Sequence, residues 1–128
     1  NNGQISIGQP VGTSDNVTFG NATVANLTVN GTTTTVNSSV VTIDDPIFTL
    51  GTSASSGTDD NKDRGIEFRY NDGAARIGFM GWDDSASSFA LLKNATNTSE
   101  VFSGTAADLT VGTVTGTEFI GLIDGGTY

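Results

Sequence analysis

One five-residue phrase recurs along this 128-residue chain and constrains how it can fold. It reads Asn16-Val-Thr-Phe-Gly20, then Asn21-Ala-Thr-Val-Ala25, then Asn26-Leu-Thr-Val-Asn30, and it returns as Asp108-Leu-Thr-Val-Gly112. Because strand side chains alternate between two faces, an odd repeat places each new apolar pair on the opposite face of a straight strand. The segment is therefore either buried on both faces or bent at every repeat. Both cases predict a repetitive, elongated β-structure.

The composition indicates that one copy of the chain cannot bury these apolar faces alone. There are 20 Thr, 17 Gly, 12 Ser and 11 Asn, whereas Ile, Leu, Val and Phe together total 31. Thr suits pleated strands, and Gly and Asn suit turns, but so few large apolar residues make a thin core. A single-chain pentapeptide-repeat β-helix needs several stacked coils, and three consecutive repeats do not supply them. We expect copies of the chain to complete one another's core.

Charge and residue usage argue against several classes of function. The net charge is −9 with only five basic residues, whereas binding to nucleic acid or anionic membranes requires clustered Lys and Arg. Cys and His are both absent, and no apolar run is long enough to be inserted in a membrane. We expect no cofactor. A chain without an initial Met or a visible signal peptide is interpreted as a processed product or a piece of a longer protein.

The patterns along the chain divide it into four regions. The apolar runs of the second region end in Val40–Ile43 and Ile47–Leu50, separated by the turn signal Asp45-Pro46. The predicted regions are an N-terminal linker (1–15), a shaft-like β segment (16–58), a small antiparallel β module (59–103), and a second shaft-like β segment with a C-terminal linker (104–128).

The predicted module begins with the clearest strand in the chain. Ile66, Phe68 and Tyr70 alternate with charged residues, as expected of a half-buried antiparallel strand. Asn71-Asp-Gly73 is a strong hairpin signal. The segments that follow are predicted to be a return strand (75–82), a turn (83–88), a third strand (Phe89–Leu92) and a polar loop (Lys93–Ser99).

Two phrases of the sequence resemble a known family. They are Asp44-Asp-Pro-Ile-Phe-Thr-Leu-Gly51 and the pair formed by Arg64-Gly-Ile-Glu-Phe-Arg-Tyr70 and Gly78-Phe-Met-Gly-Trp-Asp-Asp84. Over about residues 24–117 the chain resembles tail fibre and related fibrous virion structural proteins of tailed bacteriophages, those of marine phages in particular.

The resemblance implies an elongated, intertwined homotrimeric fibre made of triple-stranded β-helix or β-prism-like segments, with the small antiparallel module inserted. It also implies an extracellular location on the virion, a role in supporting host attachment, and contacts with other tail or fibre proteins and with a host-surface glycan. The chain carries no self-cleaving chaperone domain and no recognisable adhesin tip. The alternative is a surface adhesin or carbohydrate-binding β domain of a secreted bacterial protein.

Two sets of residues are candidates for ligand binding. Asp59, Asn61 and Asp63 have the opening spacing of a calcium loop, but Arg64 and Tyr70 occupy the places where such a loop has Gly and Glu. We therefore favour a solvated loop without a metal.

The aromatic residues Phe68, Tyr70, Phe79, Trp82 and Phe89 are interpreted as the core of the module. Tyr70 and Trp82 are kept as candidates for carbohydrate binding because each has a polar tip.

Catalysis is not expected. Without His or Cys, a glycoside hydrolase would need paired carboxylates, and Glu67, Glu100 and Glu118 lie in different segments. A polysaccharide-degrading spike remains the weaker alternative to a non-enzymatic protein.

Overall fold

The structure is a computed structural model in which residues 8–51, 57–122 and 124–125 are described. The chain divides into two units, Asn1–Asp44 and Asp45–Tyr128. The described residues form strands, turns and bends and contain no helix, so the prediction of an all-β protein is confirmed. Every strand in this part of the chain belongs to the second unit.

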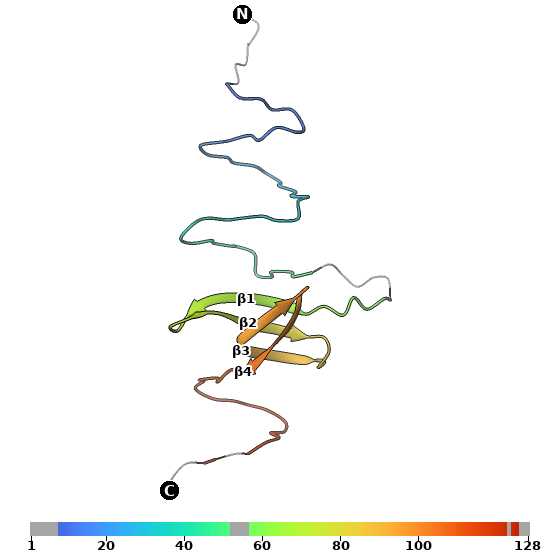
Figure 1. Ribbon diagram of the computed structural model, residues 1–128, viewed down its shortest axis with the longest axis vertical. Coiled ribbons are helices and arrows are strands. Elements are labelled where there is room, and N and C mark those ends of the chain that lie inside the picture. Colours follow the sequence, from blue (N-terminus) through green and yellow to red (C-terminus); the bar gives the residue numbers. More distant parts are fainter. Residues whose placement is uncertain (1–7, 52–56, 123, 126–128) are drawn as a thin grey trace, which may run out of the picture. The chain divides into compact units, whose positions relative to one another are not determined.

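Four strands form one open antiparallel sheet in which neighbours in sequence are neighbours in space (Figure 1). The strands are β1 (Arg64–Asn71), β2 (Ala75–Asp83), β3 (Ser88–Thr98) and β4 (Val101–Ala106). Sequential pairing of this kind needs only short turns. The sheet is therefore encoded by local turn chemistry and by strand patterns.

The first hairpin forms where the sequence predicts it. Asn71 ends β1 opposite Ala75 of β2, and the Gly73 amide donates a hydrogen bond to the Asn71 side-chain oxygen at 2.9 Å. Gly73 has φ of 106°, a conformation that a residue with a Cβ rarely adopts. The Asn-Asp-Gly sequence thus supplies both the internal hydrogen bond and the left-handed position of the turn.

The third strand is longer than predicted. The prediction of a polar loop over Lys93–Ser99 is wrong, because β3 continues to Thr98 after a register shift between Lys93 and Thr96. Asn94 has φ of 51° at this bulge. One extra residue bends the strand, and Asn tolerates the left-handed conformation better than most residues. The polar composition therefore reflects a bulged strand, not a loop.

The bend in β3 carries the β3–β4 hairpin back over one face of the sheet, which we call the covered face. The ring of Phe102 in β4 stacks on that of Phe79 in β2, with centroids 4.1 Å apart and an interplanar angle of 12°. Asn97 Nδ2 donates to Glu67 Oε2 of β1 at 3.1 Å. β4 also ends at Ala106, three residues beyond the predicted limit of the module.

The core under this hairpin is small. Phe79 is 2% exposed, and in the described residues Ala95 is the only other buried residue with an apolar side chain. Gly65 and Gly81 lie against the Phe79 ring: a Cβ on either glycine would come within 2.6–2.7 Å of it. Two glycines on paired strands therefore make the space that one aromatic ring fills.

The repeats of the first unit contain bends and no strands. Bends fall at Gly20 and Ala25, the last residues of the first two repeats, and at Gly31, just after the third. Figure 1 shows this segment as extended stretches separated by sharp turns. The alternative of a chain bent at every repeat is the one that the structure adopts. No strand forms among residues 8–51. The strands predicted at Val40–Ile43 and Ile47–Leu50 are therefore absent from the single chain.

Candidate functional site

The face of the sheet opposite the β3–β4 hairpin, which we call the open face, is apolar and uncovered. Residues that pair directly across antiparallel strands lie on the same face. Ile66 pairs with Met80, Met80 with Leu91, and Trp82 with Phe89. Together with Phe68 and Tyr70 these residues form the open face. β1 thus contributes Ile66, Phe68 and Tyr70 to this face, and β2 contributes Met80 and Trp82.

Most of these side chains are exposed to a degree unusual for their type. Phe89 is 83% exposed, and the exposed fractions of Phe68 and Met80 are 45% and 44%. The prediction that the aromatic residues form the core is therefore wrong for Phe68 and Phe89 and correct for Phe79. Alternation assigned these residues to two faces, but only the tertiary structure shows that one of the faces is left bare.

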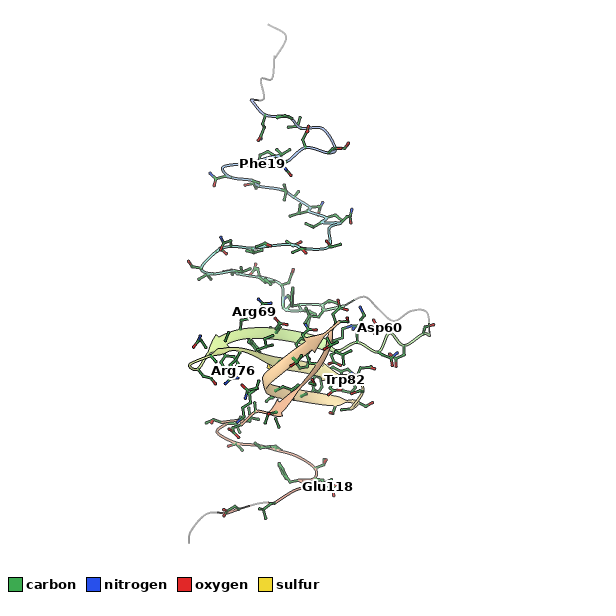
Figure 2. All side chains as sticks on the ribbon, in the orientation of Figure 1. Phe19, Asp60, Arg69, Arg76, Trp82 and Glu118 are labelled. Atoms are coloured by element: carbon green, nitrogen blue, oxygen red, sulfur yellow. The ribbon has the colours of Figure 1, made fainter. Side chains whose placement is uncertain are left out.

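Trp82 and Tyr70, the two candidates for carbohydrate binding, both lie on the open face but at opposite ends. Trp82 is 37% exposed and meets Phe89 edge to face, with ring centroids 5.3 Å apart. Tyr70 is 38% exposed, and its hydroxyl accepts a hydrogen bond from the Asn94 amide at 3.4 Å. Figure 2 shows Trp82 far along the sheet from Arg76, the register partner of Tyr70. The two rings do not form one platform.

A groove of about 550 Å³ lies on the open face where β1 and β3 begin. Its walls come from all three strands of that face and from the segment that precedes the sheet. Arg64 is the one charged residue in its lining, which otherwise consists of Leu50, Gly65, Ile66, Met80, Gly81, Phe89, Ala90 and Leu91. Such a surface can hold an apolar segment and offers few hydrogen bonds to a polar ligand.

The charged side chains at the margin of the open face are paired. Arg64 Nη2 lies 2.6 Å from Asp60 Oδ2, Arg76 Nε lies 3.1 Å from Asp72 Oδ1, and Lys93 Nζ lies 3.1 Å from Asp108 Oδ2. The hydrogen bond from Arg64 lowers the pKa of Asp60, and that from Arg76 lowers the pKa of Asp72. These contacts leave the open face with an apolar centre and a neutralised rim.

Asp63, a candidate metal ligand, has a structural role that sequence reasoning missed. Its side chain is 93% buried, and its two oxygens accept hydrogen bonds from the amides of Asp84 at 3.0 Å and Phe102 at 2.7 Å. Its own amide donates to the carbonyl of Glu100 at 2.9 Å. Asp63 thus joins the start of β1 to the β2–β3 turn and to β4. No signal in the sequence distinguishes it from its acidic neighbours.

The other two candidate ligands, Asp59 and Asn61, are joined in a local turn. The Asp59 carboxylate accepts a hydrogen bond from the Asn61 amide at 2.9 Å, which closes a local turn in which Asn61 has φ of 54°. In the ranges that the structure describes, no three acidic side chains lie close enough together to hold a metal ion. The run forms a structured loop at the entrance to β1.

A local concentration of negative charge does exist at this end of the sheet. Desolvation raises the pKa of Asp84, and the nearby carboxylates of Asp59, Asp60 and Asp63 raise it further. The adjacent Asp83 behaves in the opposite way: its carboxylate accepts hydrogen bonds from the Ala86 amide and the Ser85 hydroxyl, which lower its pKa. Neighbouring aspartates of one turn therefore have opposite electrostatic roles.

Comparison with protein-family models, with curated proteins and with solved structures gives no match for this chain. A search of the described residues for a helix long and apolar enough to cross a membrane finds none. The open face combines a large apolar area with a defined geometry.

Proposed function

We propose that this chain is a structural, non-enzymatic segment of a homotrimeric virion fibre of the bacteriophage tail-fibre type, which supports attachment to the host from outside the cell. The observation that carries the proposal is the near absence of a core in one chain. Large apolar side chains are exposed throughout the described residues, whereas Phe79 and Ala95 alone form the buried apolar set.

Exposed apolar residues also occur in the segments that precede and follow the sheet in the sequence. In the first unit they occupy the repeats and the stretch after them: Phe19, Val24, Leu27, Val29, Val36, Val40, Val41 and Ile43. After the sheet they continue with Leu109, Val111, Val114, Phe119, Ile120 and Leu122. Monomeric soluble proteins rarely expose so much contiguous apolar surface. Its burial against other copies is the simplest way for such a chain to become stable.

Association would also satisfy the backbone of the repeats. Extended segments without a paired neighbour present free amide and carbonyl groups, which in a fibre pair with adjacent chains. Interwoven chains separate slowly because many contacts must break together, and such kinetic stability suits an extracellular rod. The resemblance of residues 24–117 to tail fibre proteins supports a complex of three copies of the chain. It also supports other virion fibre proteins as neighbours and a host-surface glycan as a further partner.

The second candidate function is a carbohydrate-binding or adhesin β domain of a secreted bacterial protein. One specific observation favours it, the edge-to-face pair of Trp82 and Phe89 on an exposed surface, since aromatic rings stack on sugars. It explains the open face but leaves the exposed apolar residues of the repeats without a partner. We therefore rank it below the fibre.

Size-exclusion chromatography with light scattering on the 128-residue chain tests the proposal. The expected particle contains three chains of 13.1 kDa and persists on dilution to submicromolar concentration. A folded monomer, with cooperative unfolding at the same concentration, would overturn it. Incubation with host polysaccharide is expected to leave the polymer length unchanged, and depolymerisation would instead support an enzymatic spike.

A further inference from the structure

We infer that the open face of the sheet is the surface on which the module meets the other copies of the chain, open face against open face around the axis of the trimer. The inference rests on the proposed function for the number of copies. The choice of surface and of its occupant rests on the geometry of the sheet itself.

The covered face cannot serve as this contact, because the chain's own β3–β4 hairpin occupies it. Phe102 stacks on Phe79 there, and Asn97 binds Glu67. The amide of Phe102 is in addition tied to the buried carboxylate of Asp63. Opening this face would break a ring stack and charged hydrogen bonds together. The open face needs no such rearrangement to receive a partner.

The open face also has the size that an interface between copies requires. Each aromatic side chain offers about 150–250 Å² for burial, and Phe68, Tyr70, Trp82 and Phe89 are 37–83% exposed. Together with Ile66 and Met80 they leave several hundred Å² of apolar area bare. That area lies at the upper end of the roughly 300–600 Å² of the largest apolar patches on monomers and is of the same order as the roughly 800 Å² per partner of a stable interface.

The charge distribution supports a second copy of the chain as the partner that covers the open face. Each chain has a net charge of −9, so most of its surfaces repel the same surface of another copy. On the open face the centre is uncharged, and the basic residues at its rim, Arg64, Arg76 and Lys93, are each paired with an aspartate. Like-charged copies can therefore approach closely on this face, and the groove lined by Leu50 and Phe89 accepts their apolar side chains.

Because the chain contains no Cys, single cysteines can report on this contact without background. The test variant is Phe89→Cys, at the most exposed position of the open face, and the matched control is Arg69→Cys. Arg69 lies in β1 with its side chain 84% exposed, and its register partner Ile77 belongs with Phe79 to the other face. With a short bismaleimide, we expect Phe89→Cys to give covalent dimers of chains in high yield and Arg69→Cys to give at least tenfold less.

Trp82, the only tryptophan, supplies a second measurement that requires no substitution. In the assembled protein its fluorescence should be quenched by acrylamide several-fold less than after dissociation in denaturant, because neighbouring copies cover the open face. A trimer in which Phe89→Cys gives no more cross-linking than Arg69→Cys, and in which Trp82 is freely quenched, overturns this inference while leaving the proposed function intact.

Two other outcomes are also decisive. A monomer by light scattering overturns the proposed function, and this inference with it. Protection of Trp82 only on addition of a glycan assigns the open face to the sugar and overturns the inference as well.

Discussion

The sheet and the repeat segments use similar residues, yet only the sheet completes its hydrogen bonds within one chain. Between β1 and β4 every strand has a paired neighbour, and each turn is closed by a backbone or side-chain contact. In the first unit, the hydrogen bonds of the described residues are local, such as those between Gln9 and Thr18 or Ser38 and Val40. The difference lies in the turns, since Asn-Asp-Gly reverses the chain onto itself and the five-residue repeat only bends it.

This contrast teaches that apolar content alone does not decide whether a segment folds. Phe79 is buried because a hairpin returns over it, whereas Phe19 in the repeats is 69% exposed. The sheet is a locally determined unit, whereas the repeats form no paired strands in the single chain.

Truncation of the central ring should unfold the sheet, whereas the same change in a repeat should not. We expect Phe79→Ala to cost about 3–5 kcal/mol in the free energy of unfolding, because it removes a buried ring and leaves a cavity under Phe102. Phe19→Ala is the matched control and should leave the near-ultraviolet circular dichroism of Trp82 unchanged. Equal effects of the two substitutions on urea unfolding of the sheet would show that the regions are not independent.

Removal of the Asp63 carboxylate should detach the β3–β4 hairpin. Asp63→Ala leaves the amides of Asp84 and Phe102 without an acceptor, at about 1–3 kcal/mol for each buried amide left unsatisfied. We expect a loss of about 2–4 kcal/mol and faster hydrogen exchange at the Phe102 amide. Asp59→Ala removes a carboxylate that is bonded only within its own loop and serves as control. If both variants exchange at the wild-type rate, Asp63 does not hold the hairpin.

A methyl group at Gly81 should be tolerated far less well than one in a repeat. A Cβ there meets the Phe79 ring at 2.7 Å and the backbone carbonyl of Arg64, so overpacking should cost about 1–3 kcal/mol. Gly112, the last residue of the repeat after the sheet, has nothing within 4 Å of such a Cβ. Gly112→Ala should therefore leave the thermal unfolding midpoint of the sheet unchanged, and a lower midpoint would reveal a neighbour of Gly112 in the assembly.

The smallest expected effect is a difference between Asp83 and Asp84 in how each affects the stability of the sheet as the pH changes. The pKa of Asp83 is lowered, so its carboxylate stabilises the fold above its ordinary pKa, and this stabilisation is lost as the pH falls through the lowered value, below about pH 4. The pKa of Asp84 is raised, so its contribution is present at low pH and is lost as the pH rises.

At pH 7, Asp83→Asn should thus lower the unfolding midpoint of the sheet slightly and Asp84→Asn should raise it, and both differences should diminish as the pH falls below about 4. Thermal unfolding followed at several pH values checks this. Shifts of the same sign at pH 7 would contradict the assigned electrostatic roles.

Much of the local structure was predictable because it depends on neighbours in sequence. Alternation over Ile66, Phe68 and Tyr70 identified β1, and Asn71-Asp-Gly73 identified its turn. The odd repeat left two alternatives open, and the structure adopts the one with bends, at Gly20 and Ala25. The bulge at Asn94 was missed because the polar sequence around it resembles that of a loop. The predicted third strand therefore ended at Leu92, whereas β3 continues to Thr98. The repeats form no strands although the sequence predicted them. A segment with high β-strand propensity still needs a neighbouring strand to pair with, and the propensity of its residues does not supply one.

The amino-acid sequence alone was enough to predict the class of fold and the first hairpin, and it excludes thiol and histidine chemistry. Only the tertiary structure decided that Phe79 is buried and Phe89 bare, that Asp63 is a buried acceptor, and that Trp82 and Tyr70 lie apart. The physical reason is that alternation assigns side chains to two faces but does not say which face is covered. That choice is made at the bulge of β3, which turns Phe102 onto one face and leaves the other for a partner.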